Sequence, residues 1–523
     1  MKVANHKVEN INGPLNPVNP TRLLWPGLLL LCSLLKLWLV AGVELGKDEA
    51  AYWHWGQHLD ATYALLPFGI LRLAHALLPY QEWFLRLPSI LSSTLATLLL
   101  YRLCRLHPLS PERARWAATL FATSHWVWHT GSYLHPDGFL VTCWLLALYW
   151  ARLAIDQQTP VAFAKIGLAI GLAILCKYSA AFLAAPLFLW ILLAHPARTR
   201  YRFFLSALIP ALLVAAPLIH AQLQTDFYLP FTLSSLSRIA AEHPLPLRLL
   251  HFLFNPLFFV SPLLLYLLYR AWGASLLDLF RERNSQNLLT LLPALTPVAA
   301  FAFFALFRGQ IKGNWILPAF LGLWPLAFSS RLLPLRTRTF SIAALAVGLI
   351  HALTVAFALR YPGSLETIAN DLGDSRLNAT YVRLVSTPDQ QREPTFSWTE
   401  RLGEYHDWSG LANRFDELLD RHRIPASTPL VSTQYGIPFS LSFYSPTRRS
   451  YYTVDDPRFR HLTDFHERTG AEASDQLLFL VRSGSPIPTS LQELYPHRQN
   501  LGPISRIPPD CRPIAYTITL LHR

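Results

Sequence analysis

The chain has 523 residues, of which 52% are hydrophobic and 15% are charged, and its formal net charge is +13. Soluble proteins contain about 25% charged residues, and here the apolar residues gather in long blocks, so the composition excludes an ordinary soluble domain. The cations form no basic patch with interleaved aromatic residues, which excludes nucleic acid as an expected partner. The chain is therefore expected to be a polytopic α-helical membrane protein.

The first apolar block, residues 22–42, is long enough to cross a bilayer, which takes about 20 residues. A polar leader precedes it and further apolar blocks follow it, so we expect a retained span and not a cleaved signal peptide. With this block, the sequence predicts about eleven crossings. The others are expected at about 85–106, 116–130, 138–155, 163–176, 179–195, 203–222, 249–270, 287–307, 315–330 and 340–359.

The distribution of arginine and lysine predicts how the spans are oriented in the membrane, because cytoplasmic loops carry an excess of these residues. Alternate loops hold Arg102, Arg105, Arg113 and Arg115, then Arg152 and Lys165, then Arg198, Arg200 and Arg202, then Arg270, Arg281 and Arg283, then Arg331, Arg336 and Arg338. An odd number of crossings then gives a cytoplasmic tail at 1–20, a transmembrane domain at 21–359 and an exported domain at 360–523. The positive charge is thus expected to face the cytoplasm and anionic membrane lipids.

The stretch GKDEAAYWHWGQHLD, residues 46–60, places Asp48 and Glu49 where the chain leaves its first span. Its aromatic residues suit a helix lying in the membrane interface, and acidic residues at such a helix start are also favoured by the helix dipole alone. A second loop on the same face, HTGSYLHPDGFL, contains His135 and Asp137, where Asp137 could equally be a helix cap. Two short acidic loops at span ends on one face favour a shared site.

Three cations are expected in the non-cytoplasmic loops, although those loops are otherwise poor in arginine and lysine. Lys177 lies in the turn CKYS, and Arg308 and Lys312 lie in FRGQIKGNW. Any one of them could simply extend toward lipid headgroups. Together they could bind an anion, and phosphate is the obvious anion at a membrane surface.

After residue 360 charged residues become frequent, and proline and serine mark turns. The pattern predicts a small α/β domain with an amphipathic helix at LANRFDELLDRH and a short helix at SLQELYP. Strands are expected at PLVSTQY, RRSYYTV, QLLFLVR and AYTITLL. Cys511 is the only cysteine of this tail, so no disulfide framework is expected there.

Four segments carry a resemblance to a known family: KDEAAYWHWGQHLD, GSYLHPDGFLVTCWLLALY, GLAIGLAILCKYSAAFLAAPLFLWILL and GNWILPAFLGL. In their order and spacing they resemble the GT-C glycosyltransferases of the dolichyl-phosphate-mannose protein mannosyltransferase type, which include bacterial aminoarabinose lipid A transferases. The resemblance runs from about residue 22 to 330. In the tail, HDWSGLANRFDELL and PLVSTQYGIPFSLSFYS also fit bacterial relatives.

The resemblance implies a polyprenyl-phosphate sugar donor, an inverting transfer and catalysis on the non-cytoplasmic face of a bacterial inner membrane. It favours a lipid or envelope-glycan acceptor such as lipid A, and it leaves protein hydroxyl groups open. The family's acidic residues correspond to Asp48, with Glu49 beside it, and to Asp137. Its other motif residues correspond to Lys177 and Tyr178 and to Asn314 and Trp315, and we count His135 with the donor-binding residues.

One position departs from the family. Relatives continue the first loop with His-Pro-Pro or Glu-Lys-Pro, whereas this chain reads YALLPFGI, with Leu66 before Pro67. The departure removes a polar group expected near the donor phosphate. An altered acceptor, a divergent mechanism and lost activity would each be consistent with it.

The expected chemistry suits these residues. An acceptor hydroxyl is a poor nucleophile, so a positioned carboxylate that takes its proton would help, and Asp48 is the candidate base. The leaving lipid phosphate gains charge that nearby cations would stabilise. No cofactor is otherwise expected, although paired acids could hold a divalent metal.

The main alternative is a transporter or flippase of lipid-linked sugars. Transporters usually contain repeated halves and polar or broken helices at mid-membrane, whereas here the carboxylates lie at span ends and we find no repeat. Another envelope enzyme with a lipid-linked donor also stays open. A non-enzymatic scaffold would explain the exported domain but not the two acidic loops.

Overall fold

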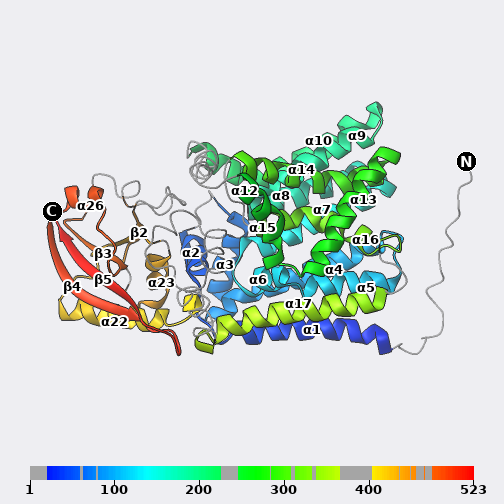
Figure 1. The fold of residues 1–523 in the computed structure, drawn as a ribbon. Helices are drawn as coiled ribbons and strands as arrows, with labels where there is room; N and C mark the ends of the chain where they lie inside the picture. Colours follow the sequence, from blue (N-terminus) through cyan, green and yellow to red (C-terminus); the bar gives the residue numbers. More distant parts are fainter. Residues whose placement is uncertain are drawn as a thin grey trace, which may run out of the picture.

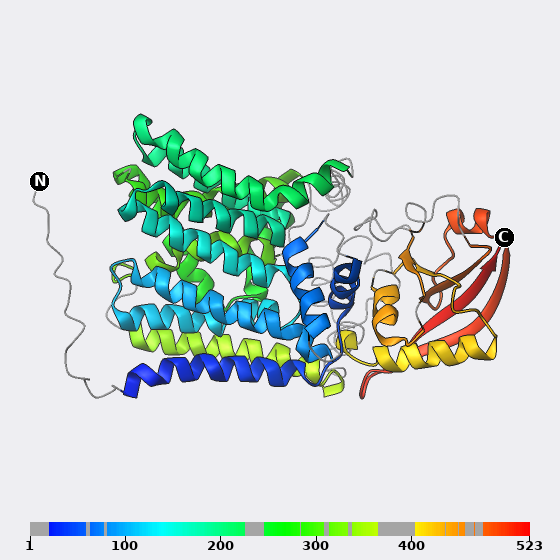
Figure 2. The ribbon, with the colours of Figure 1, turned by 180° about the vertical axis from the view of Figure 1, so that it is seen from behind.

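The computed structural model describes residues 20–58, 63–77, 81–224, 245–282, 284–307, 313–332, 337–364, 403–434, 436–447, 449–454, 465 and 474–523. A bundle of roughly parallel helices makes up most of the molecule, and a smaller part that contains a β-sheet lies against one end of it (Figures 1 and 2). We call the end of the bundle nearest the sheet, with residues 41–46 and 133–135, the sheet end. The opposite end, with residues 106–110 and 158–159, is the far end.

Long helices form the frame of the bundle: α1 (Pro20–Val40), α4 (Glu82–Arg105), α7 (Pro136–Gln157), α8 (Pro160–Cys176), α10 (Ala197–Gln224), α13 (Pro262–Arg281), α14 (Ser285–Phe307) and α17 (Thr337–Arg360). Shorter helices complete it: α2 (Lys47–His58), α3 (Leu65–Leu77), α5 (Pro111–Ala122), α6 (His125–Ser132), α9 (Ala181–Ala194) and α12 (Leu245–Phe254). Within the described residues, six helices (α4, α7, α10, α13, α14 and α17) have the length and apolar character to cross a membrane. The expected polytopic membrane fold is confirmed.

Three predicted crossings are interrupted. The block 116–130 is split between α5 and α6, where the Ser124 hydroxyl accepts a hydrogen bond from the backbone N–H of Val127 and caps α6. The block 249–270 breaks after α12, and α13 starts with Pro262 at its first position, where proline is favoured. The block 315–330 is a chain of short pieces, namely α15 (Gly313–Ile316), the 3₁₀ helix η4 (Leu317–Leu323) and α16 (Trp324–Ala327).

The centre and the periphery of the bundle differ in burial. Helix α7 is mostly buried, whereas α10 exposes apolar side chains such as Leu205 and Leu213, as expected for a lipid-facing helix. Helices α8 and α10 approach closely, because a Cβ atom added to Gly167 would lie 1.9 Å from the carbonyl oxygen of Ala207. Small residues at helix interfaces allow this contact between backbones.

The sheet has the strand order β2-β1-β3-β5-β4. Strand β1 (Leu430–Ser432) runs parallel to β2 (Tyr451–Thr453) and β3 (Gln476–Arg482), and β5 (Ile514–His522) runs antiparallel to β3 and to β4 (His497–Arg506). The helices of this part are α22 (Trp408–Arg421), α23 (Ile437–Tyr444) and α26 (Thr489–Leu494). All four predicted strands and both predicted helices are present, which confirms the small α/β architecture.

The sequence analysis missed β4 and α23. Strand β4 contains Pro503 and a register shift between Asn500 and Gly502, features that an edge strand tolerates. Residues 365–402 lie outside the described residues, so the expected domain boundary at 360 stays a prediction.

Candidate active site

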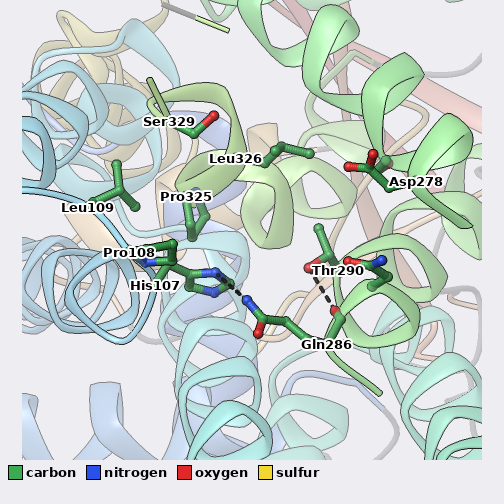
Figure 3. Close-up of a pocket in the computed structure, with 11 residues that line it drawn as sticks. His107, Pro108, Leu109, Asp278, Gln286, Thr290, Pro325, Leu326 and Ser329 are labelled. Atoms are coloured by element: carbon green, nitrogen blue, oxygen red, sulfur yellow. Dashed lines mark hydrogen bonds between the residues drawn. The ribbon is translucent and has the colours of Figure 1, made fainter. Parts of the chain in front are cut away.

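A recess opens at the far end of the bundle (Figure 3). His107 and Gln286 contribute to its wall and lie 3.4 Å apart, nitrogen to nitrogen, and Arg331 binds both carboxylate oxygens of Asp278 at 2.6 Å. Burial, together with the charge of Arg152, lowers the pKa of His107 to about 4. The length of α4 separates this recess from both acidic loops, so it is not the site that the sequence predicts.

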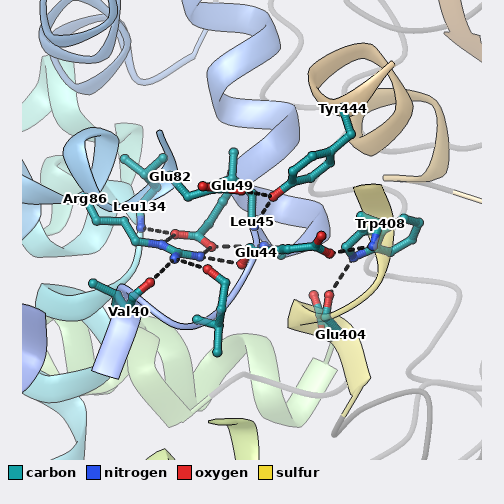
Figure 4. Close-up of polar contacts among 12 residues, drawn as sticks. Val40, Glu44, Leu45, Glu49, Glu82, Arg86, Leu134, Glu404, Trp408 and Tyr444 are labelled. Atoms are coloured by element: carbon teal, nitrogen blue, oxygen red, sulfur yellow. Dashed lines mark hydrogen bonds and ion pairs between the residues drawn. The ribbon is translucent and has the colours of Figure 1, made fainter. Parts of the chain in front are cut away.

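The acidic loops meet at the sheet end, and Glu49 links them (Figure 4). Its buried carboxylate accepts hydrogen bonds from the Arg86 guanidinium at 2.9 and 2.6 Å, from the backbone N–H of Gly46 at 3.0 Å and from that of Leu134 at 2.7 Å. Leu134 of the second acidic loop is thus bound to Glu49, which follows Asp48 in the first loop. These contacts give Glu49 a structural task, because both of its oxygens already serve as acceptors.

Arg86 extends this connection to the end of α1. Its side chain is 0% exposed and donates to the carbonyl oxygens of Val40 at 2.9 Å, Val43 at 2.8 Å and Glu44 at 2.6 Å. A buried charge is tolerated only when it is paired and hydrogen-bonded, and Arg86 satisfies both conditions. The first acidic loop therefore has a fixed conformation around one guanidinium group.

Asp48 lies in the first turn of α2 and is exposed, in contrast to its neighbour Glu49. The pKa of the Tyr63 phenol is affected by an aspartate from each acidic loop. Burial raises its pKa above the ordinary value, and the charges of Asp137 and Asp48 raise it further. Asp48 and Asp137 therefore both lie within electrostatic range of the Tyr63 phenol.

Asp137 forms an ion pair with Lys177. Its Oδ1 accepts a hydrogen bond from the Lys177 Nζ at 2.6 Å, and its Oδ2 lies 3.5 Å from Nδ1 of His135. The imidazole of His135 accepts from the backbone N–H of Asp137 at 3.2 Å, so the cap of α7 is His135 and not Asp137. The Lys177 ammonium also lies 5.9 Å from the ring centroid of Trp315.

A small recess opens beside this ion pair. Its polar lining is Asp137, Lys177 and Ser179, and its apolar lining is Leu140, Trp144, Phe182, Phe301, Trp315 and Pro318. An apolar wall with a few convergent polar groups is typical of a ligand site. Tyr178 stands next to it and packs against Tyr63, with 5.7 Å between ring centroids.

Several predicted site residues cannot be placed with these. Arg308 and Lys312 lie outside the described residues, and Asn314 belongs to α15 without a described side chain. Leu66 lies in α3, half-buried against the main core of the bundle, so packing accounts for its apolar character. Among the described residues, no three His, Cys, Asp or Glu side chains gather in a way that could hold a metal ion.

Sequence reasoning missed Arg86 and Tyr63. A signal for Arg86 existed, because an ionisable residue inside an apolar block is expensive and therefore usually functional or paired. Tyr63 offered no comparable signal, since a tyrosine near a membrane interface is ordinary.

Parts of the chain are similar in sequence to known proteins. Residues 63–220 match the family described as dolichyl-phosphate-mannose-protein mannosyltransferase. The lipid A galacturonosyltransferase RgtD of Rhizobium johnstonii is 29% identical over 184 residues, which are 34% of this chain and 38% of that protein. The undecaprenyl phosphate-alpha-4-amino-4-deoxy-L-arabinose arabinosyl transferase of Pectobacterium carotovorum is 28% identical over 327 residues, 57% of this chain and 56% of that protein. The chain therefore spans less than two thirds of the length of both curated relatives.

Structural comparison extends over almost the whole chain. ArnT from Cupriavidus metallidurans, bound to undecaprenyl phosphate, shares 13% identity with a TM-score of 0.58 over 96% of this chain and 98% of that chain. This likeness concerns the fold, and it includes the part with the sheet. Residues 63–220 therefore resemble the dolichyl-phosphate-mannose-protein mannosyltransferase family, and the chain shares the fold of ArnT.

Proposed function

We propose that the chain is a membrane glycosyltransferase that moves a sugar from a polyprenyl-phosphate donor to a lipid or envelope-glycan acceptor, with inversion at the anomeric carbon. The proposal is supported by the Asp137–Lys177 ion pair and by the hydrogen bond that ties Glu49, next to Asp48, to Leu134, within a fold shared with a protein solved bound to undecaprenyl phosphate. The names of both curated relatives describe sugar transferases, one of them acting on lipid A.

In the proposed reaction, the acceptor oxygen attacks the anomeric carbon while the bond from that carbon to the phosphate oxygen breaks. Asp48 takes the proton of an acceptor hydroxyl, and the lipid phosphate leaves with the electron pair. Asp48 suits this task because it is exposed while Glu49 beside it is fully engaged. Glu49 thus supports catalysis by holding the loop that carries the base.

Asp137 and Lys177 would hold the donor. A lysine ammonium has three N–H donors, and Asp137 uses one, so Lys177 can still donate to a phosphate oxygen. Asp137 fixes the ammonium in place, and His135 borders the other carboxylate oxygen. Arg308 and Lys312 complete the proposed phosphate contacts, with Tyr178 and Asn314 near the sugar.

The first test compares the envelope lipids and glycans of cells with and without the intact gene by mass spectrometry. A sugar lost from a lipid or glycan supports the proposal, and a sugar lost from protein would instead identify a protein O-glycosyltransferase. Accumulation of the lipid-linked sugar on one leaflet, with all glycans intact, would favour a flippase.

Replacing Lys177, Arg308 and Lys312 singly by alanine is expected to slow transfer. Losing a positioned cation at a developing phosphate charge costs about 2–4 kcal/mol in the transition state, whereas losing a headgroup contact costs well under about 1 kcal/mol. We expect Arg308→Ala to have the largest effect, because a guanidinium can bind two phosphate oxygens. Rates are measured with a purified polyprenyl-phosphate sugar. Wild-type rates and donor affinity in all three folded variants would show that the phosphate is bound elsewhere.

We further propose that the sheet end faces the periplasm and that residues 1–20 are cytoplasmic, since the arginine-bearing ends of α4 and α13 and the start of α10 lie at the far end (Figure 1). Reporter fusions at about residues 110, 200 and 335 should report the cytoplasm, and a fusion after 360 should report the periplasm. A cytoplasmic signal after 360 would reverse the topology and move the proposed site to the other face.

A divalent metal remains part of the proposal as an auxiliary. Mg²⁺ usually binds one or two carboxylates together with phosphate oxygens of the substrate. Asp48 is the exposed carboxylate that could contribute, since Asp137 is already bound to Lys177. Incubation with a chelator, followed by addition of Mg²⁺ or Mn²⁺, should abolish and restore transfer if a metal acts. Unchanged rates after chelation would remove the metal from the mechanism.

A further inference from the structure

We call the described residues from 403 onward, which contain the β-sheet, the sheet part. The sheet part binds residue 44, in the loop that precedes Asp48, through the start of α22. The Glu44 carboxylate accepts a hydrogen bond from the backbone N–H of Trp408 (Figure 4). It also accepts from the backbone N–H and the hydroxyl of Ser409. The Glu44 N–H in turn donates to the carbonyl oxygen of Tyr405 at 2.9 Å. A carboxylate at the N-terminus of a helix is favoured by the free N–H groups and the dipole of that helix.

Helix α23 provides a second connection, to the loop and to α2 itself. The Tyr444 hydroxyl accepts from the Leu45 N–H at 2.7 Å and donates to a Glu82 carboxylate oxygen at 3.1 Å. Beside it, the rings of Trp53 and Phe443 meet edge to face, with centroids 4.9 Å apart. Polar and aromatic contacts therefore join α23 to the helix that carries Asp48 and Glu49.

The third connection is a close approach of backbones at Gly436, just before α23. Gly436 has φ +94, and a Cβ atom built on it would lie 2.4 Å from Cβ of Lys47 and 3.2 Å from its Cα. Lys47 is the first residue of α2 and precedes Asp48. Because the obstructing atoms are at the base of the Lys47 side chain, the start of α2 and the start of α23 would have to separate if Gly436 gained a side chain.

We propose that the C-terminal sheet part is a positioning element of the active site, and that Glu44, Tyr444 and Gly436 hold the first turn of α2 where Asp48 can act. The proposal rests on the proposed glycosyl transfer and deepens it. It predicts that small changes on the sheet part, without contact to donor or acceptor, slow the chemical step. A misplacement of about 1 Å at a reacting group can cost about 100-fold in rate.

Gly436→Ala and Gly484→Ala form a matched pair that tests this. Gly484 has nearly the same φ, +93, but its added Cβ would meet no atom within 4 Å. Both variants thus place alanine at the same positive φ, and only Gly436→Ala pushes on Lys47. Tyr444→Phe and Tyr495→Phe form a second pair, because the Tyr495 hydroxyl donates to Ser474 within the sheet part, at 2.9 Å.

Two measurements are made on the full-length proteins: kcat and KM for a purified polyprenyl-phosphate sugar, and amide hydrogen exchange of residues 44–50. Gly436→Ala and Tyr444→Phe should lower kcat about tenfold or more with little change in KM, and should speed exchange at 44–50. Gly484→Ala and Tyr495→Phe should change neither. If Gly436→Ala does not fold, Tyr444→Phe and Glu44→Gln decide the question.

Unchanged exchange at 44–50 in Gly436→Ala and Tyr444→Phe would overturn the proposal, and so would faster exchange with an unchanged kcat. Equal losses in both members of each pair would also overturn it, since they would indicate general destabilisation. If the wild-type chain transfers no sugar, the proposed glycosyl transfer fails, and the exchange measurement alone decides whether the sheet part holds α2.

Discussion

Replacing Asp48 by asparagine is expected to slow sugar transfer by about 100-fold or more while the protein stays folded. Asparagine keeps the shape and hydrogen-bonding capacity of the side chain and removes its basicity. Asp48 is exposed in the first turn of α2, so the substitution should disturb little packing. The measurement is the rate of transfer from a purified polyprenyl-phosphate sugar by wild-type and variant protein.

Asp137→Asn and Asp156→Asn serve as comparisons for Asp48→Asn. Asp156 is exposed and pairs with Arg152 on the far-end half of α7, so its variant should transfer normally. Asp137→Asn should weaken donor binding, because Lys177 loses its anchoring partner. Near-normal turnover by Asp48→Asn, combined with a dead Asp137→Asn, would assign the base to the second loop.

Replacing Arg86 by leucine should lower the free energy of unfolding by about 3–5 kcal/mol. The substitution leaves the Glu49 carboxylate buried without its cation, and it removes the donors bound to the carbonyl groups of Val40, Val43 and Glu44. Thermal unfolding of the purified protein in detergent measures the effect. Much of the protein is expected to fail to accumulate, which expression level reports independently.

Two further variants test the reason for this loss. Arg331→Leu removes an ion pair with Asp278 that is partly exposed, and should cost less than about 1 kcal/mol. The double change Arg86→Leu with Glu49→Leu should recover part of the stability, because no charge is then left buried alone. Wild-type stability in Arg86→Leu would mean that the loop is held by other contacts.

The spans were predictable because a crossing needs a continuous apolar length, which the sequence displays directly. The breaks within three of these spans were not predictable from the sequence. Pro262 and Ser124 lie inside apolar blocks, and whether a helix breaks at such residues depends on which neighbouring helix offers partners. In the tail, the amphipathic period identified α22, whereas α23 is apolar on most sides and gives no period to read.

The grouping of the candidate residues was predictable to the extent that topology decides it. Asp48, Asp137 and Lys177 lie at helix ends at the sheet end of the bundle, and their placement there follows from the order of the helices. The division of labour between Asp48 and Glu49 does not follow from sequence. It depends on Arg86, 37 positions along the chain from Glu49, whose guanidinium selects one carboxylate of the pair.

The glycine contact between α8 and α10 decides how this protein could be engineered. Under the proposed function, directed evolution toward another sugar would vary the wall of the small recess, for which Ser179, Phe182 and Phe301 offer side chains of different size. Gly167 has to stay outside such a library, since any larger residue would meet the Ala207 carbonyl and move α8, whose end carries Lys177. Substitutions aimed at donor specificity therefore belong in the recess beside the end of α8, and the α8 residues that contact α10 should be kept.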